Sequence, residues 1–207
     1  MSAREDVLDR IRAANAAAGH PEPVPVPRDY HRAGTLAPAS PELLELLVDR
    51  LVDYKATVIG AAPADVPAAI ARGLSDAGVR GRVIVPTGLP EGWCPDGVPD
   101  EPGFTPHDLD GFAAVVTASA AACAMTGTIA LDGSPDQGRR AITLVPDVHV
   151  CVVAAPQVVE TVPELLARLE PTRPTTFVSG PSATSDIELE RVEGVHGPRT
   201  LVVVLVR

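Results

Sequence analysis

The segment Thr-Leu-Val-Val-Val-Leu-Val, residues 200–206, is an unbroken apolar run near the end of the chain. A run of this kind, without polar alternation, is typical of a strand that is buried on both faces. Similar runs occur at 57–59, 82–85, 113–117 and 148–153. Continuous apolar strands favour a parallel sheet that is covered on both faces.

Helices are expected between several of these strands. Ser40, Pro41 and Glu42 begin one of them, because they supply an N-cap, a proline at the first helical position and an acid in the first turn. Further helices are predicted over 64–74 and over 157–169. This alternation of strands and helices predicts an α/β domain, with a sheet flanked by helices.

Other segments carry weaker patterns. Small residues fill 118–124, and we interpret them as a tightly packed helical turn. Turn-forming residues at 132–138 separate the apolar segments 129–131 and 141–145, which predicts a β-hairpin as the antiparallel element. The segment 87–110 is rich in Pro, Gly and acids and is expected to be a long surface loop.

The first residues are expected to form an arm outside the domain. Ser2 and Glu5 have the spacing of a capping box, which predicts a short helix after them. Prolines alternate with other residues over 21–27, and proline keeps the chain extended there. The predicted organisation is an N-terminal helix and Pro-rich arm over 1–35, followed by one domain over 36–207.

The composition limits the classes of partner. The chain has 207 residues, with 27 acidic and 17 basic side chains and a formal net charge of -10. A nucleic-acid backbone requires a basic footprint, so no nucleic-acid partner is expected. We recognise neither an export signal nor a membrane span, and we predict a cytoplasmic protein without membrane insertion.

The cysteines give no sign of a metal centre. Cys94, Cys123 and Cys151 are widely separated and form no Cys-x-x-Cys pair, which is the usual local signature of zinc and iron–sulfur sites. Cys123 and Cys151 lie in apolar segments and are expected in the core. We therefore expect no metal site and no cofactor of the chain's own, so that any redox centre belongs to a partner.

Polar residues concentrate between the strands expected at 175–178 and 200–206. Residues 179–199 read SGPSATSDIELERVEGVHGPR and are rich in small and ionisable side chains. A loop whose ends are fixed by buried strands is a common place for a functional site. The same residue types also serve as ordinary turn and capping residues, so composition alone leaves both interpretations open.

This stretch resembles the signature of the lactate-utilisation protein C family, also called the LUD domain. Two upstream segments, TGT at 126–128 and RAITLVPDVHV at 140–150, resemble two further blocks of that family. The resemblance extends from Ser40 to the C-terminus. It implies the NagB/RpiA/CoA-transferase type of α/β fold and identifies 36–207 as the LUD domain.

The resemblance also implies a role in the oxidation of L-lactate to pyruvate. In that context partner proteins supply the iron–sulfur clusters, and this chain would be an accessory or ligand-binding subunit of a cytoplasmic system. Its expected ligand is a small organic anion or the phosphate of a nucleotide. The implied partners are iron–sulfur lactate-utilisation proteins.

Two of the family blocks carry groups that suit an anion. Backbone N–H groups and hydroxyls in a Gly-containing loop can form a nest for an oxyanion, and arginine can grip a carboxylate or phosphate with two hydrogen bonds. If the loops meet at the carboxyl edge of the sheet they form a cradle, whereas otherwise they are turns serving only themselves. Arg139 is expected in solvent. The predicted ligand-binding residues are Thr126, Gly127, Thr128, Arg140, Gly180, Ser182, Thr184 and Arg199.

Candidate proton-transfer residues lie in the same polar stretch. Asp186 and Glu188 are the carboxylates chosen, and His196, framed by glycines, is the histidine chosen. His149 is interpreted instead as a hydrogen-bonded structural residue. Family members commonly carry an acid immediately before the Thr-Gly-Thr block, and Met125 occupies that position here, which weakens the case for catalysis.

Two other functions stay open. A stand-alone enzyme of the isomerase or acyl-transfer kind would use Asp186 or Glu188 as base with assistance from His196, although a shared fold is weak evidence for a reaction. A purely structural protein would dock a partner through its Pro-rich arm.

Overall fold

The protein is described from a computed structural model of the 207-residue chain. It describes residues 2–19, 25–185, 191–193 and 197–207. The chain divides into two compact units, residues 1–30 and 31–207.

The first unit contains the predicted N-terminal helix, α1 (Ala3–Ala17). Its capping box is formed, because Glu5 N donates to Ser2 Oγ at 3.3 Å and Ser2 N donates to the Glu5 carboxylate at 2.7 Å. None of its residues is buried, so this helix contributes no side chain to a core within its own unit.

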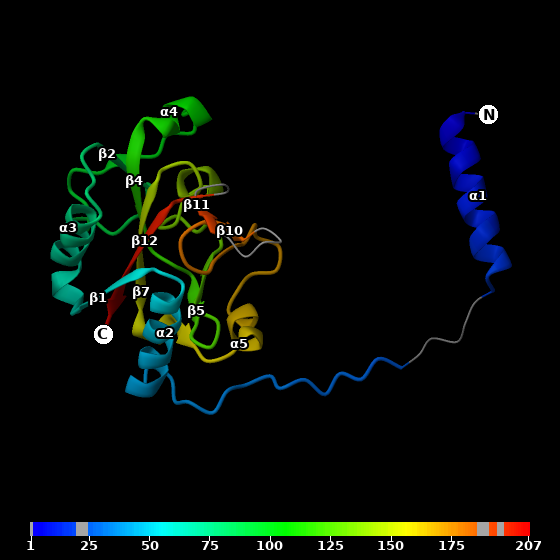
Figure 1. Cartoon of the computed structure of the whole chain (residues 1–207), viewed down its shortest axis with the longest axis horizontal. Helices are drawn as coiled ribbons and strands as arrows, with labels where there is room; N and C mark the ends of the chain where they lie inside the picture. Colours follow the sequence, from blue (N-terminus) through cyan, green and yellow to red (C-terminus); the bar gives the residue numbers. More distant parts are fainter. Residues whose placement is uncertain (1, 20–24, 186–190, 194–196) are drawn as a thin grey trace. The chain divides into compact units, whose positions relative to one another are not determined.

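The second unit is built on a six-stranded sheet in the order β1-β12-β7-β4-β2-β3 (Figure 1). Every neighbouring pair is parallel, which confirms the parallel sheet predicted from the apolar runs. The strands are β1 (Thr57–Ala61), β2 (Arg82–Val85), β3 (Val98–Pro99), β4 (Phe112–Thr117), β7 (Val148–Ala154) and β12 (Thr200–Val206).

Each face of this sheet has its own cover. The helix α3 (Val66–Asp76) packs on one face, where it contacts the side chains of Val202 and Val204 of β12. The helix α2 (Pro41–Asp53) lies over the opposite face (Figure 1), where Leu201 and Leu205 join its core. The two cores confirm a sheet that is buried on both sides.

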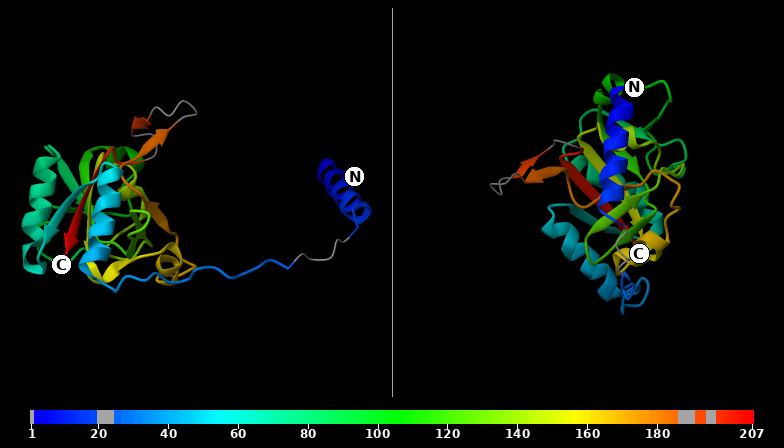
Figure 2. Two further views of the ribbon diagram at one scale, coloured as in Figure 1. Left: turned by 60° about the horizontal axis from the view of Figure 1, so that its bottom comes forward. Right: turned by 90° about the vertical axis from the view of Figure 1, so that its right-hand side faces the viewer.

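A second, four-stranded sheet completes the cover on the α2 side. Its order is β8-β5-β6-β9, with β6 antiparallel to both β5 and β9 and with β5 parallel to β8. These strands are β5 (Ala121–Cys123), β6 (Thr128–Leu131), β8 (Val158–Val159) and β9 (Thr176–Val178). A separate antiparallel pair, β10 (Ala183–Ser185) and β11 (Arg191–Glu193), extends away from the two larger sheets (Figure 2).

Short helical segments connect the strands. The segment predicted as a long loop, 87–110, carries β3 and a short helix of its own. The segments are α4 (Pro106–Asp110), α5 (Val162–Ala167) and the single 3₁₀ turns η1 (Pro63–Asp65), η2 (Arg140–Thr143) and η3 (Ala155–Gln157).

The helical turn predicted at 118–124 is wrong, because these residues contain β5. Ala120 N donates to the carbonyl of Ala130 at 2.9 Å, and Ala118 N donates to the carbonyl of Asp136 at 3.0 Å. Small side chains let the neighbouring backbone come close enough to satisfy these groups. Such pairing to a distant segment outweighs the weak local preference of a run of alanines.

The hairpin predicted from 129–131 and 141–145 is also wrong, because these two segments do not pair with each other. The antiparallel neighbours of β6 are β5 and β9, and η2 replaces the predicted second strand. In the intervening loop, Gln137 Oε1 accepts a hydrogen bond from Asp132 N at 2.7 Å. The loop therefore ends in a 3₁₀ turn and does not close a hairpin.

Two further predictions need correction. The single helix predicted over 157–169 is β8 followed by α5, with Pro163 in the first turn of α5, where its missing N–H costs little. The strand predicted to be buried at 175–178 is the edge strand β9, and Phe177 is 51% exposed there.

We predict that Glu160 fastens the segment before α2 to the domain. Its carboxylate oxygen Oε2 accepts from Thr35 N at 2.5 Å and from Leu36 N at 2.6 Å. In Glu160→Ala both amides lose this acceptor, and their hydrogen exchange should accelerate by roughly tenfold, the equivalent of about 1.4 kcal/mol. Glu45→Ala, an exposed change on α2, is the matched control, and equal exchange rates in the two variants would contradict the assignment.

Candidate functional site

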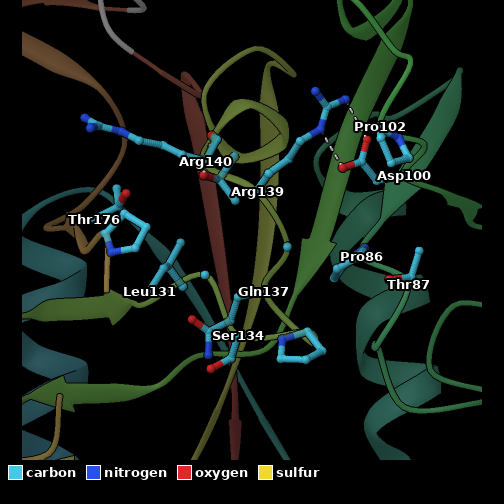
Figure 3. Close-up of a pocket in the computed structure, with 15 residues that line it drawn as sticks. Pro86, Thr87, Asp100, Pro102, Leu131, Ser134, Gln137, Arg139, Arg140 and Thr176 are labelled. Carbon is cyan, nitrogen blue, oxygen red and sulfur yellow. Dashed lines mark hydrogen bonds and ion pairs between the residues drawn. The ribbon is translucent and has the colours of Figure 1, made fainter. Parts of the chain in front are cut away.

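A cavity of about 620 Å³ opens between the carboxyl end of β2 and the second sheet (Figure 3). Pro86 and Thr87 line it after β2, and Leu131 and Thr176 line it from β6 and β9. The loop 133–140, which leads into η2, closes another side. This cavity therefore lies where the covering sheet meets the end of a central strand.

Arg139 occupies one wall of this cavity and is not in solvent, contrary to expectation. Its Nε and Nη2 bind the Asp100 carboxylate at 2.7 and 2.8 Å. Nη2 also donates to the carbonyls of Glu101 and Phe104 at 3.2 and 3.1 Å. Because Asp100 neutralises it and holds it in place, Arg139 is a structural cross-link between the loop and the chain after β3.

Arg140 extends in the direction opposite to Arg139, toward the side of the cavity formed by Thr176 (Figure 3). Its side chain is exposed and forms no ion pair with any residue that the structure describes. A guanidinium in this state retains its full capacity to bind a carboxylate or phosphate.

A second cavity of about 250 Å³ adjoins the first, and Thr143 and Thr176 line both. It lies over the amino ends of β7 and β12, where His149 and Leu201 form its floor. The loop 179–182 covers it from the side of β9. The two cavities together form one crevice between the sheets.

His149 is buried at the floor of the smaller cavity. Its Nε2 lies 2.8 Å from Thr117 Oγ1 on the adjacent strand β4. Thr117 Oγ1 also lies 3.8 Å from Cys151 Sγ, which in turn donates to the carbonyl of Ala118 at 3.7 Å. The hydrogen bond expected for a structural histidine is present, but the residue also faces a cavity.

Burial determines the protonation states of this group of side chains. Loss of hydration lowers the pKa of His149 to about 4, so the imidazole is neutral at physiological pH. The same effect raises the pKa of the Cys151 thiol to about 12, so Cys151 stays protonated. The floor of the cavity therefore carries no charge.

The Thr-Gly-Thr block and the start of the polar stretch lie side by side. Thr128 Oγ1 lies 2.8 Å from Ser179 Oγ, and Thr126 Oγ1 donates to Thr128 Oγ1 at 2.8 Å. The contact follows from the register in which Ile129 of β6 pairs with Val178 of β9. The two loops thus meet at the end of the second sheet and not at the carboxyl edge of the central one.

The glycines of both loops face the end of α2. Gly127 has φ +59°, and a Cβ on it would lie 3.0 Å from Arg50 Cβ. Gly180 has φ +82°, and a Cβ on it would lie 2.6 Å from Tyr54 Cβ and 2.9 Å from its carbonyl oxygen. These positions require glycine for backbone conformation and for close packing against the helix.

The remaining predicted ligand-binding residues are spread over different surroundings. Ser182 lines the smaller cavity, and its N donates to the carbonyl of Pro198 at 2.8 Å. Arg199 binds the Asp147 carboxylate through Nε and Nη2 at 2.6 and 2.8 Å. Thr184 pairs with Val192 in the backbone of β10 and β11.

The three residues predicted for proton transfer, Asp186, Glu188 and His196, lie outside the described residues. Met125, at the position where the resemblance implies an acid, is 53% exposed in the turn between β5 and β6. Its N donates to the carbonyl of Glu160 at 3.0 Å.

The described residues were also searched for metal ligands and membrane spans. They contain no group of three or more His, Cys, Asp or Glu side chains placed to hold a metal ion. No helix among them has both the length and the apolar character needed to cross a membrane.

Comparison with known proteins shows the family. The family model described as "LUD domain" matches residues 94–206, more than half of the chain. The chain belongs to the LUD domain family. This LUD domain protein is 45% identical over 214 residues to the lactate utilization protein C of Deinococcus radiodurans, covering 99% of this chain and 95% of that protein.

Further similarities are consistent with this assignment. A lactate utilization protein C from Exiguobacterium is 33% identical over 99 residues, covering 44% of this chain and 43% of the relative. The crystal structure of a DUF162 family protein from Deinococcus radiodurans superposes with a TM-score of 0.69 at 40% identity. It covers 84% of this chain and 100% of that chain, which supports the α/β architecture.

Sequence reasoning selected Arg140 and Ser182, which line the crevice, but it did not select two other lining residues, His149 and Thr143. His149 was assigned a structural role only, and Thr143 was not singled out. The available signal was the period of two in β7, which places His149 and Cys151 on one face of the sheet. The contact of His149 with Thr117 depends on the register of β4 and β7, which the sequence does not specify.

We predict that Gly180→Ala destabilises the LUD domain by about 2–4 kcal/mol, because it adds a steric conflict with Tyr54 to the cost of a left-handed backbone. Gly78→Ala is the matched control. Gly78 has φ +71° and no atom within 4 Å of an added Cβ, so the control should cost only about 1 kcal/mol. Urea unfolding of both variants measures the difference, and equal losses would show that Gly180 is not packed against α2.

We predict a pH dependence of stability that arises from His149. Its pKa is near 6.5 when unfolded and about 4 when folded, so between these values the unfolded chain binds the additional proton. The free energy of unfolding therefore falls by up to about 3 kcal/mol as the pH drops through this window. His149→Gln should flatten this part of the profile relative to the exposed control His107→Gln, and parallel profiles for the two variants would contradict it.

Proposed function

We propose that this LUD domain protein is an accessory or ligand-binding subunit of a cytoplasmic system that oxidises L-lactate. Its similarity to a lactate utilization protein C over nearly the whole of both chains supports this role. We further propose that it binds a small organic anion, or the phosphate of a nucleotide, in the crevice between its two sheets.

The crevice carries this proposal. It joins two cavities of about 620 and 250 Å³, with hydroxyls, a neutral imidazole and the guanidinium of Arg140 on its walls. Ligand sites in proteins are commonly concave, mostly apolar and equipped with a few convergent polar groups. The smaller cavity has room for an acid of a few carbon atoms, and the larger one has room for a nucleotide.

Arg140 supplies the positive charge in this proposal. Arg139 is neutralised by Asp100, and Arg199 is paired with Asp147. A carboxylate that enters the larger cavity can therefore be met by Arg140 without breaking an existing ion pair. This arrangement favours an acidic ligand over a neutral one.

The proposed partners are proteins that carry iron–sulfur clusters. A thiol has to lose its proton to bind a metal, and burial opposes this change at Cys151. Cys123 is buried as well, whereas Cys94 lies in the segment after β2. The burial of Cys123 and Cys151 therefore supports a subunit that works beside a redox centre held by another protein.

We predict that the purified chain binds pyruvate or L-lactate in calorimetric titrations, and that Arg140→Ala weakens this binding by roughly tenfold. The reason is the loss of one charge-assisted hydrogen-bonding group from the cavity. AMP is titrated in parallel, because a nucleotide phosphate would use the same guanidinium.

Arg72→Ala is the matched control for this titration. Arg72 is an exposed arginine on α3 that pairs with Asp76, outside the crevice. Equal affinities of the two variants, or no binding of any of these anions by the unaltered chain, would overturn the proposed site. Turnover of a ligand by the isolated chain, lost in Glu188→Gln, would instead indicate a stand-alone enzyme.

A further inference from the structure

The floor of the smaller cavity carries the buried imidazole of His149. His149 is the second residue of β7, and the apolar side chain of Leu201 lies beside it on the floor. Thr143 and Ser182 line its walls, and the Thr143 hydroxyl donates to the carbonyl of Arg140 at 3.0 Å. A ligand that reaches the bottom of this cavity therefore meets the edge of one imidazole ring.

The imidazole has one nitrogen that contacts Thr117 and one that has no partner among the described residues. Nε2 is hydrogen-bonded to Thr117, and Nδ1 has no hydrogen-bond partner among the described residues. Every fully buried side-chain nitrogen or oxygen in the described part of the chain has a partner. His149 lines the smaller cavity, and Nδ1 is the ring nitrogen that the described protein leaves available to it.

The partners of Thr117 favour one of the two neutral forms of the ring. Cys151 gives its proton to the carbonyl of Ala118, so Thr117 has two acceptors to choose from, His149 Nε2 at 2.8 Å and Cys151 Sγ at 3.8 Å. Sulfur is a weak acceptor, and the imidazole nitrogen is both closer and stronger. With Thr117 as the donor to Nε2, the proton of the neutral ring lies on Nδ1.

We propose that the Nδ1–H of His149 donates a hydrogen bond to the carboxylate or carbonyl oxygen of a small 2-oxo or 2-hydroxy acid in this cavity, with Thr117 as the positioning residue that fixes the tautomer. The inference rests on the proposed function, because it specifies the class of acid and the atom that it meets. The low pKa of the buried ring agrees with a neutral donor.

The tautomer is tested without any ligand. Long-range proton–nitrogen spectra of the chain labelled at histidine nitrogens should show His149 protonated at Nδ1 and unprotonated at Nε2 at neutral pH. Thr117→Val removes the hydroxyl with little change in shape, and the Nδ1–H form should lose its dominance. An Nε2–H ring or an imidazolium in the unaltered chain would overturn the assignment.

The contact with the acid is tested by titrating the same labelled chain with pyruvate. The Nδ1 and attached proton resonances of His149 should shift with the occupancy measured by calorimetry, while those of the exposed His107 stay in place. His149→Leu should weaken pyruvate binding by roughly tenfold, whereas His107→Gln should leave it unchanged. If His149→Leu does not fold, the resonance shifts in the unaltered chain still test the contact.

The possible outcomes separate the two proposals. Pyruvate binding that depends on Arg140 but leaves the His149 resonances and the His149→Leu affinity unchanged would overturn only this inference. Absence of binding to the unaltered chain would overturn both. Binding that is weakened in both Arg140→Ala and His149→Leu and accompanied by a shift at Nδ1 would support both.

Discussion

The burial of both faces of β12 is the constraint on which the rest of the structure depends. Its neighbours β1 and β7 are both parallel to it, and its residues 201–205 are at most 2% exposed. A strand without a polar face has to be covered on two sides, which α3 does on one side and α2 with the second sheet does on the other. The chain enters β12 from the polar stretch, so this cover brings residues 179–182 over the amino ends of β7 and β12.

The second sheet is held against α2 by close backbone packing. Gly127 and Gly180 lie near Arg50 and Tyr54, at positions where any side chain would conflict with the helix. This packing explains why two segments that are distant in the sequence lie side by side in the fold, with the hydroxyl of Thr128 in contact with that of Ser179. On the other side of the crevice, the Arg139 ion pair holds the loop 133–140 to the chain after β3. The crevice is the space left between these two attachments.

The sequence alone predicts those helices and strands that are determined by the pattern of their own residues. The apolar strands of the central sheet and the capped start of α2 follow from residues that are adjacent in the chain. The strand at 121–123 could not be predicted, because alanines carry no period and β5 forms only when β6 and β8 are present. The same limit applies to the site. The block from 126 and the block from 179 were recognised, but the pairing of His149 with Thr117 depends on strand register.

The distribution of charge explains how an acidic molecule can offer a place to an anion. Asp100 neutralises Arg139 and Asp147 neutralises Arg199, while burial keeps His149 neutral. With a formal net charge of -10, the field of the whole chain opposes the approach of a negative ligand. Affinity then has to come from short-range groups in the crevice, which under the proposed function are the exposed Arg140 guanidinium and a neutral donor that costs less to bury than a cation. Under the proposed function, the position of each donor, and not the overall charge, determines which acid the crevice accepts.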